Sequence, residues 1–366
     1  MTVAFVFPGQ GSQAVGMGRA LADNFASARA VFEEVDGALG DKLSSIIFEG
    51  PADRLTLTEN AQPALMAVSL AAMRVLEAEA GLDLARDAQF VAGHSLGEYS
   101  ALAAANAFSL ADAARLLRTR GQAMQKAVPV GVGAMAALLG LEFDAAAAVA
   151  AEAAQGQVCQ AANDNGGGQV VVSGDKAAVE RAVELAKSKG AKRAMLLPVS
   201  APFHCALMQP AAEVMAEALS KVSVKKPVVP VVANVLAKPI QEPAEIVQAL
   251  VSQVTGTVRW RESVAAMAQA LAKVNIKKPV VPVVANVLAK PIQQPAEIVQ
   301  ALIKQVTGTV RWRESVAAMA GAGVKTFYEI GAGKVLSGLI KRIAEGSSAT
   351  AIGTPDDIAA FKAARA

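Results

Sequence analysis

One serine of the chain lies in a sequence pattern that is typical of activated hydroxyl groups. Gly93-His94-Ser95-Leu96-Gly97 has the form G-x-S-x-G. In a nucleophile elbow this pattern places the serine on a sharp turn between a strand and a helix, with its oxygen exposed. The two glycines lack the Cβ atoms that would collide in such a turn. The pentapeptide also occurs by chance, as an ordinary strand-to-helix turn, but its flanking sequence favours Ser95 as a nucleophile.

A nucleophilic serine needs a base, and the chain has only two histidines. His94 is adjacent to Ser95, so its side chain should point away from that of Ser95 if the last strand residues alternate faces. His204 lies on a proline-containing segment that precedes a helix expected over 207–222. Because catalytic groups concentrate in such connecting segments, we predict His204 as the base. A hydrogen-bonded structural histidine is the alternative that spacing leaves open.

The elements around Ser95 read as a buried strand over 90–92 and an alanine-rich helix over 99–107. A second short strand, over 3–7, leads into the glycine-containing loop 8–13, whose backbone is able to approach a substrate and aim an N–H at an oxyanion. Its glycine spacing is not that of a dinucleotide fingerprint. Apolar residues at three- and four-residue spacing predict further helices over 17–39 and 62–80.

A helix over 110–127, with Ser109 as its N-cap, bears Arg115, Arg118 and Arg120. At these spacings the three arginines cannot all lie on one face, so most of them should be solvated. Arg120 precedes Gly121 in the second half of the helix and is the candidate to turn inward.

Between residues 133 and 198 the pattern predicts strand 133–139, helix 144–154, strand 157–162, strand 169–173, helix 175–189 and strand 193–198. This βαββαβ order is typical of a ferredoxin-like unit. We therefore predict an α/β fold with a large domain over 1–128 and 199–366, a mostly parallel sheet, and a small ferredoxin-like domain inserted over 129–198. The active site should lie in the cleft between them. Segment 163–168 is interpreted as a hairpin turn, and neither it nor segment 331–334 fits a phosphate-binding loop.

The composition fits a folded protein of the cytoplasm. Hydrophobic residues make up 53% of the 366 residues and charged residues 18%, which excludes a disordered chain. Its longest purely apolar stretches are far shorter than a membrane span, and the first residues lack a secretion signal. Two cysteines, Cys159 and Cys205, are too few for a disulfide framework and, with two histidines, make no convincing zinc site.

Residues 216–267 recur almost unchanged at 268–319, with seven differences over 52 positions. The second copy contains seven Lys or Arg and two Glu, so the rest of the chain has 28 basic and 30 acidic residues. The formal net charge of +3 therefore comes from the repeat, and no aromatic or arginine-rich pattern supports binding of nucleic acid.

Five separated segments resemble the malonyl-CoA:acyl carrier protein transacylases, in the same order along nearly the whole chain. They are FPGQGSQ at 7–13, GHSLGEY at 93–99, RGQAMQ at 120–125, PVSAPFH at 198–204 and YEIGAGKVL at 328–336. The resemblance implies an α/β-hydrolase-like large domain and a transfer by two half-reactions through a malonyl-serine intermediate.

The resemblance also implies a role for each matching residue. Ser95 would be the nucleophile and His204 the base, and Arg120 would bind the malonyl carboxylate. Backbone N–H groups of Gln10 and Leu96 would hold the oxyanion. Malonyl-CoA and acyl carrier protein are the implied partners. No metal or redox cofactor is implied, because coenzyme A is the leaving group of the donor.

In this family a glutamine backbone carbonyl orients the histidine, and here the repeat offers two candidates. Gln253 in the first copy follows His204 at the expected spacing, whereas Gln305 would serve if the second copy docks. Without 52 residues the chain would have 314, an ordinary length for the family, so one copy is surplus. The spare copy loops out of a monomer, exchanges with a neighbouring molecule as a swapped dimer, or reflects an error in the sequence.

Two other functions share parts of this pattern. A serine esterase or thioesterase would use the same Ser-His pair but admit water, and an acyltransferase of polyketide synthesis would differ only in its pathway. A non-catalytic docking module would not need Ser95. Phe203, directly before the base, should crowd a methyl branch on the substrate's α-carbon, which favours malonyl over methylmalonyl groups.

Overall fold

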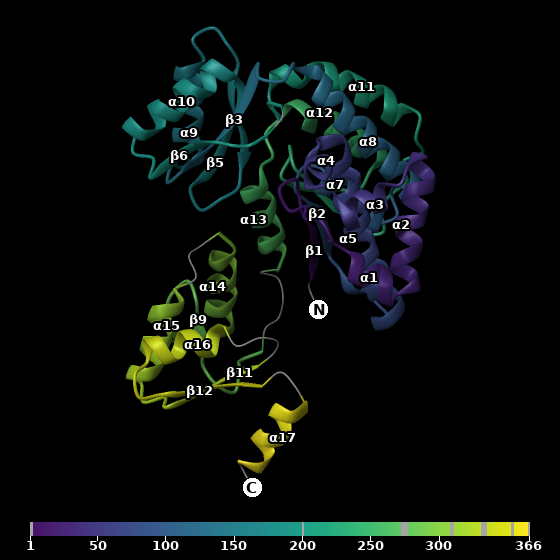
Figure 1. The fold of residues 1–366 in the computed structure, drawn as a ribbon. Helices are drawn as coiled ribbons and strands as arrows, with labels where there is room; N and C mark the ends of the chain where they lie inside the picture. Colours follow the sequence, from purple (N-terminus) through teal and green to yellow (C-terminus); the bar gives the residue numbers. More distant parts are fainter. Residues whose placement is uncertain are drawn as a thin grey trace. The chain divides into compact units, whose positions relative to one another are not determined.

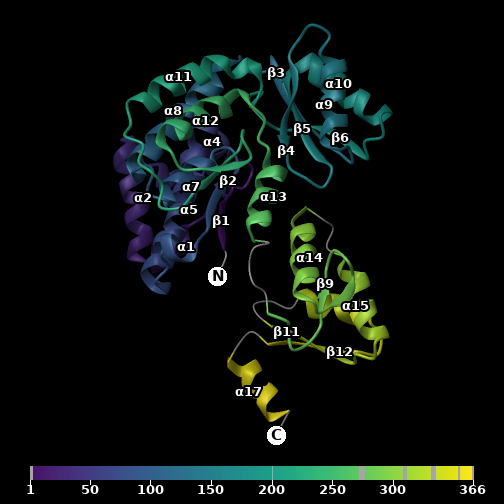
Figure 2. The ribbon, with the colours of Figure 1, turned by 180° about the vertical axis from the view of Figure 1, so that it is seen from behind.

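The computed structural model describes residues 3–199, 201–271, 277–307, 311–330, 335–352 and 355–364. The chain divides into two compact units, Met1–Leu271 and Ala272–Ala366, each of which is described by itself. Figures 1 and 2 show the elements of both units from opposite sides.

The first unit contains a sheet whose strands lie in the order β1-β2-β7-β8. Its strands are β1 Ala4–Phe7, β2 Phe90–Gly93, β7 Val231–Ala233 and β8 Lys238–Ile240. The first three are parallel, and β8 pairs antiparallel with β7 as a hairpin. Strand β2 is central and fully buried, as expected for a parallel strand covered on both faces. The carboxyl ends of β1 and β2 therefore lie side by side, which brings the 8–13 loop next to Ser95.

Helices of the first unit pack around this sheet (Figure 1). They are α1 Arg19–Asn24, α2 Ala26–Leu39, α3 Leu43–Glu49, α4 Ala52–Thr56, α5 Thr58–Ala80, α6 Leu84–Asp87, α7 Gly97–Ala104, α8 Leu110–Ala127, the 3-10 helix η1 Ala206–Met208, α11 Gln209–Ser220, α12 Pro243–Thr255 and α13 Trp260–Leu271. The prediction for α8 is confirmed, and the Ser109 hydroxyl accepts the Asp112 N–H at 3.0 Å as its N-cap. The single helix predicted over 17–39 is wrong, because Phe25 is extended and separates α1 from α2.

Residues 133–196 form a second, fully antiparallel sheet with two helices. The elements are β3 Gly133–Leu139, α9 Phe143–Ala154, β4 Cys159–Asp164, β5 Gln169–Asp175, α10 Lys176–Ser188 and β6 Arg193–Leu196. Their order along the chain is the predicted one, and the strands lie in the order β4-β5-β3-β6. Both helices bury alanines and valines in a core of their own, of which Val149 and Val179 are members.

The chain after α12 connects this second sheet to the first. Val258 donates its N–H to the Ala162 carbonyl at 2.8 Å and accepts the Asp164 N–H at 3.0 Å. The Arg261 guanidinium contacts the Asp164 carboxylate at 2.8 Å. The neighbouring Arg259 donates its N–H to the carbonyl of Asn234, directly after β7, at 3.0 Å, so this segment contacts both sheets.

The second unit begins with a replica of the β7–β8 hairpin. Its elements are β9 Val283–Ala285, β10 Lys290–Ile292, α14 Pro295–Thr307, α15 Trp312–Gly321, β11 Thr326–Ile330, α16 Val335–Ile343, β12 Ser348–Ile352 and α17 Pro355–Ala363. Strands β9 and β10 pair in the register of β7 and β8, and β11 and β12 are parallel. Val316, Phe327 and Ile340 belong to a small core within this unit.

Apolar residues over 228–236 and 280–288 predict one strand in each copy of the repeat, and both predictions are too long. Each segment holds only a three-residue strand before the chain turns back. In both copies the turn ends at an alanine with left-handed φ, 50° at Ala237 and 53° at Ala289. Segment 331–334, where the sequence excludes a phosphate-binding loop, lies outside the described residues. Within the described ranges, no helix combines the length and the apolar character that a membrane crossing requires.

Candidate active site

Ser95 lies at the turn between β2 and α7, as the pentapeptide predicts. Its φ of 53° is in the left-handed region, which non-glycine residues rarely occupy outside strained turns. A Cβ on Gly93 would stand 1.9 Å from the Gly97 carbonyl carbon, and one on Gly97 would stand 2.5 Å from the Phe7 carbonyl oxygen. Only glycine allows strand, turn and helix to approach this closely.

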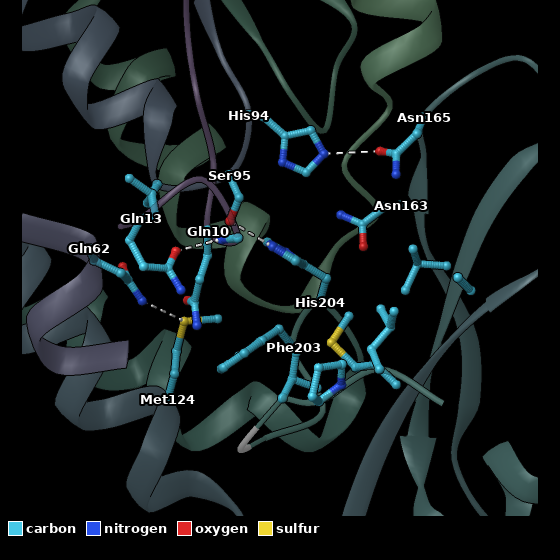
Figure 3. Close-up of a pocket in the computed structure, with 18 of the residues that line it drawn as sticks. Gln10, Gln13, Gln62, His94, Ser95, Met124, Asn163, Asn165, Phe203 and His204 are labelled. Carbon is cyan, nitrogen blue, oxygen red and sulfur yellow. Dashed lines mark hydrogen bonds between the residues drawn. The ribbon is translucent and has the colours of Figure 1, made fainter. Parts of the chain in front are cut away.

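The Ser95 hydroxyl and the His204 imidazole are in direct contact. The distance from Ser95 Oγ to His204 Nε2 is 2.8 Å, although 109 positions separate the two residues (Figure 3). The other ring nitrogen, Nδ1, is 2.8 Å from the backbone carbonyl of Gln253, which can only accept a hydrogen bond. This acceptor keeps the proton on Nδ1 and leaves Nε2 free to take a proton from the serine.

His204 is buried, with 4% of its surface exposed. Burial, together with the nearby Arg120 guanidinium, lowers the pKa of His204 from its ordinary value of 6.5 to about 3. The imidazole is therefore neutral at physiological pH, which is the form that a general base requires.

Arg120 turns inward from α8 and is 1% exposed. Its Nη2 lies 3.1 Å from Ser95 Oγ and 2.8 Å from Gln253 Oε1, and its Nη1 donates to Gln62 Oε1 at 2.7 Å. Burial lowers the pKa of the guanidinium, yet arginine stays charged in proteins. Its hydrogen-bond partners in the described chain are amide and hydroxyl oxygens, so the guanidinium makes no direct ion pair there, although the Glu98 carboxylate is close enough to raise its pKa.

Two amide side chains hold these groups in place. Asn234 Oδ1 accepts the Ser95 N–H at 2.7 Å, and Asn234 Nδ2 donates to the Gly93 carbonyl at 2.7 Å. Gln253 Nε2 donates to the Ser95 carbonyl at 3.0 Å and to Glu98 Oε2 at 2.7 Å. Both amides belong to the segment that follows His204, and their hydrogen bonds hold the N–H and the carbonyl of Ser95 and the carbonyl of Gly93.

A cavity of about 490 Å³ opens beside Ser95 and is lined by the segments that follow β1 and β2, by residues of α5 and α8, and by the sheet formed by 133–196. The predicted residues Gln10, Leu96 and Phe203 all line it, together with Ser95, Arg120 and His204. Gln10 is held by its side chain, which accepts the Thr58 hydroxyl at 2.8 Å. The cavity thus lies where the sequence predicts, between the 133–196 unit and the segments that carry Ser95 and Arg120.

His94 faces the antiparallel sheet, away from the hydroxyl of Ser95. Its Nε2 lies 3.0 Å from Asn165 Oδ1, and Asn163 lies nearby on the cavity wall (Figure 3). Burial lowers the pKa of His94 as well. The predicted turn at 163–168 is a β4–β5 hairpin loop, and it adds two asparagines to the cavity that sequence reasoning did not assign to the site.

Asn234 and Gln253, which contact Ser95 and His204, belong to the first copy of the repeat. Gln305 lies in the second unit, on α14. Local bonds of the second copy repeat those of the first: the Arg311 N–H bonds the Asn286 carbonyl, as the Arg259 N–H bonds the Asn234 carbonyl, both at 3.0 Å.

Sequence reasoning predicted that Ser95, His204 and Arg120 belong to the site, and the structure brings all three together. It assigned no role to Gln62, Glu98 or Asn234. These residues form hydrogen bonds to other side chains and to the backbone, and no spacing rule links them to Ser95. A signal existed for Glu98 alone, because a glutamate on an otherwise apolar helix directly after an elbow has to be buried.

Comparisons with known proteins agree with this geometry. Residues 4–326 match the family described as "Acyl transferase domain". The chain is 41% identical over 357 residues to a malonyl CoA-acyl carrier protein transacylase of Bacillus subtilis, covering 97% of this chain and 95% of the relative.

The chain is also similar to solved structures of malonyltransferases. An acyl-carrier-protein-S-malonyltransferase from Bartonella henselae is 50% identical, with a TM-score of 0.70 and coverage of 100% of this chain and 99% of that one. A malonyl-transacylase solved in complex with its type II PKS acyl-carrier protein is 38% identical, with a TM-score of 0.69 and coverage of 98% and 99%.

Proposed function

The chain belongs to the acyl transferase family and moves malonyl groups from malonyl-CoA to acyl carrier protein; we propose that Ser95 carries the malonyl group between the two thiols. The observation on which this proposal rests is the position of Ser95 Oγ, 2.8 Å from a neutral imidazole and 3.1 Å from a buried guanidinium. A base and an anion site thus converge on one hydroxyl, and the product supplies fatty acid chain elongation.

In the first half-reaction Ser95 Oγ attacks the thioester carbonyl while His204 Nε2 takes its proton. The tetrahedral intermediate then collapses, the C–S bond breaks, and His204 returns the proton to the departing coenzyme A sulfur. The Gln253 carbonyl holds Nδ1–H through both steps and stabilises the imidazolium while it exists.

Backbone N–H groups of Gln10 and Leu96 form the oxyanion site in this proposal. Two observations support it: both residues line the cavity, and Leu96 directly precedes the first residue of α7. A helix N-terminus carries partial positive charge, so it stabilises an oxyanion without any rearrangement at the moment of reaction.

Arg120 binds the free carboxylate of the malonyl group. Its Nη1 and Nη2 donate to Gln62 and Ser95, which line the cavity with it, and the planar fork of arginine matches a carboxylate with two hydrogen bonds. A buried cation that forms no direct ion pair gains most from an anionic substrate. Phe203 closes the site beside the acyl group and disfavours a branch at the α-carbon.

In the second half-reaction the phosphopantetheine thiol of acyl carrier protein attacks the malonyl-serine ester. His204 takes the thiol proton and returns it to Ser95 Oγ as the ester bond breaks, which restores the free enzyme. The chemistry needs no metal or redox cofactor, and coenzyme A enters only as the leaving group of the donor.

The organisation of the chain is part of the proposal. Residues 1–128 and 199–366 form the α/β-hydrolase-like domain, and 129–198 form an inserted ferredoxin-like domain that supplies one wall of the cavity. The first copy of the repeat completes the site, so the enzyme works as a monomer, with exchange of the second copy as a route to dimers. Two reduced, buried cysteines fit the cytoplasm.

The decisive experiment separates transfer from hydrolysis. Enzyme is mixed with labelled malonyl-CoA, first alone and then with holo acyl carrier protein. We expect a labelled protein that persists until the carrier is added and then passes its label to the carrier. Prompt release of free malonate without carrier would contradict the proposal and indicate a thioesterase.

A further inference from the structure

Glu98 is a buried carboxylate that the reaction above does not use. It lies in the first turn of α7, three residues after Ser95, and only 1% of its surface is exposed. Burial raises the pKa of Glu98 from 4.5 to about 7, against the opposing effects of its hydrogen bonds and of Arg120. A carboxylate kept in such a place costs folding free energy, which calls for a compensating role.

One oxygen of Glu98 accepts two hydrogen bonds. Oε2 accepts the side-chain amide of Gln253 at 2.7 Å and the backbone N–H of Asn234 at 3.1 Å. Both donors come from the segment after His204, whereas Glu98 is on the helix after Ser95. The residue therefore joins the two parts of the chain that supply nucleophile and base.

The side-chain amide of Gln253 contacts Arg120, Glu98 and Ser95 at once, so its orientation decides whether all three hydrogen bonds form. Its Oε1 accepts from Arg120 at 2.8 Å while its Nε2 donates to Glu98 and to the Ser95 carbonyl. If the amide rotated by half a turn, its NH2 group would face the Arg120 guanidinium and its oxygen would face the Glu98 oxygen. Either contact would be repulsive, so Arg120 and Glu98 together select one orientation.

Asn234 depends on Glu98 in a similar way. With its backbone N–H held by Glu98, its side chain reaches the Ser95 N–H and the Gly93 carbonyl, both at 2.7 Å. These two bonds satisfy the backbone of the elbow at its most strained residue. A shift of Asn234 would release the turn that exposes the Ser95 hydroxyl.

We infer that Glu98 is a positioning residue for malonyl transfer: its Oε2, as a hydrogen-bond acceptor, sets Gln253 and Asn234 and through them the relative placement of Ser95, His204 and Arg120. This inference rests on the proposed function of the Ser95 site. The role needs an acceptor oxygen at a fixed reach, and it does not need a negative charge.

Two substitutions separate the effect of the side-chain length of Glu98 from the effect of its negative charge. Glu98→Gln keeps the length and offers its amide oxygen to both donors, but it removes the charge. Glu98→Asp keeps the charge but withdraws the acceptor by one methylene. Glu33→Gln and Glu33→Asp are matched controls on an exposed glutamate of α2. Initial rates of malonyl and acetyl loading are measured, with circular dichroism to establish the folded fraction.

We expect kcat of Glu98→Gln within about threefold of the unchanged enzyme, and a loss of about tenfold or more in Glu98→Asp, since small misplacements of reacting groups have large kinetic effects. Acetyl loading should fall with malonyl loading in Glu98→Asp, because Ser95 itself is displaced. The Glu33 variants should behave like the unchanged enzyme.

The opposite order, with Glu98→Asp active and folded Glu98→Gln impaired, would overturn the inference in favour of a required charge. So would a folded Glu98→Asp protein with unchanged kcat and only a lower melting temperature, which a merely structural role predicts. If the unchanged enzyme transfers no malonyl group, the proposed function itself fails, and this is decided before any variant is compared.

Discussion

Burial controls the two ionisable groups that contact Ser95. It keeps His204 neutral, with a pKa lowered to about 3, and it surrounds Arg120, a cation that forms no direct ion pair in the described chain. The same low polarity that makes the imidazole a free base makes the guanidinium a strong site for an anionic substrate. Both effects require that the cavity be assembled, so neither is visible in the sequence.

The depressed pKa of His204 leads to a prediction for titration. We expect neither imidazole of the chain to titrate near 6.5, because burial lowers the pKa of both His94 and His204. Two-dimensional NMR of the ring protons from pH 4 to 8 measures this, with a His94→Gln variant for assignment. A midpoint for His204 between 6 and 7 would contradict the buried, neutral base.

The sign of the linked stability follows from the same shift. The pKa of His204 in the unfolded chain is about 6.5, above its folded value of about 3. The residue therefore contributes stability that is present above pH 6.5 and is lost progressively as the pH falls toward 3. Glu98 has the opposite sign: its folded pKa of about 7 exceeds its ordinary value of 4.5, so its contribution is present below about pH 4.5 and lost as the pH rises through 7.

Arg120 should discriminate between acyl groups. We expect Arg120→Ala to reduce malonyl loading by about 100-fold or more, because a buried charge-assisted pair is lost, and to reduce acetyl loading far less. The ratio of the two loading rates, measured on one preparation, cancels any loss of folded protein. An equal loss for both substrates would remove Arg120 from the carboxylate site.

Residue types and spacing were enough to find Ser95 and His204, because a serine elbow and a pair of histidines leave few candidates. Arg120 was one of three arginines until the family resemblance singled it out, and its inward direction is a property of how α8 packs. Gln62 and Glu98 were not predicted, because each contacts the site through a residue that is far away in sequence: Gln62 through Arg120, and Glu98 through Gln253.

In the elbow, the local sequence determines the structure, because steric crowding permits only glycine at two positions. Gly93 and Gly97 had to be glycines, and the structure places backbone where their side chains would lie. The long strand predicted over 228–236 illustrates the reverse. Its apolar residues suit a strand, but Asn234 leaves the sheet pattern to bond Gly93 and Ser95, a tertiary requirement that overrides local propensity.

Two glycine substitutions test the elbow at the level of the element. Gly93→Ala should destabilise the protein by more than about 3 kcal/mol or prevent folding, since its Cβ has no space. Gly37→Ala, inside α2 with open space around its Cβ, should instead stabilise by about 0.5–1 kcal/mol. Urea unfolding measures both, and equal effects would contradict the close approach of β2 and α7.

At the scale of the molecule, a nearly exact repeat raises the question of which copy serves the site. Asn234→Ala should lower malonyl loading by about tenfold or more, because it removes two bonds from the elbow, while Asn286→Ala should leave the rate unchanged. Chromatography of both variants reports the oligomeric state. Equal effects, or a loss that appears only in the double variant, would show that the copies exchange.

A chain without residues 268–319 extends the comparison. This deletion leaves the site-forming segment intact, so we expect malonyl loading to be retained, and the intact mass of the full chain, calculated as 37.4 kDa, establishes whether the protein contains both copies. The repeat was plain from the sequence, but its effect on the fold was not, because identical segments have identical local preferences.

The central claim is that Ser95 carries the malonyl group, and peptide mapping tests it most directly. The protein is incubated with malonyl-CoA without carrier protein, digested and analysed by mass spectrometry, beside a Ser95→Ala variant. We expect one malonyl group per chain, on the peptide that contains Ser95, and none on the variant. A malonyl group on another residue, or equal labelling of Ser95→Ala, would contradict it.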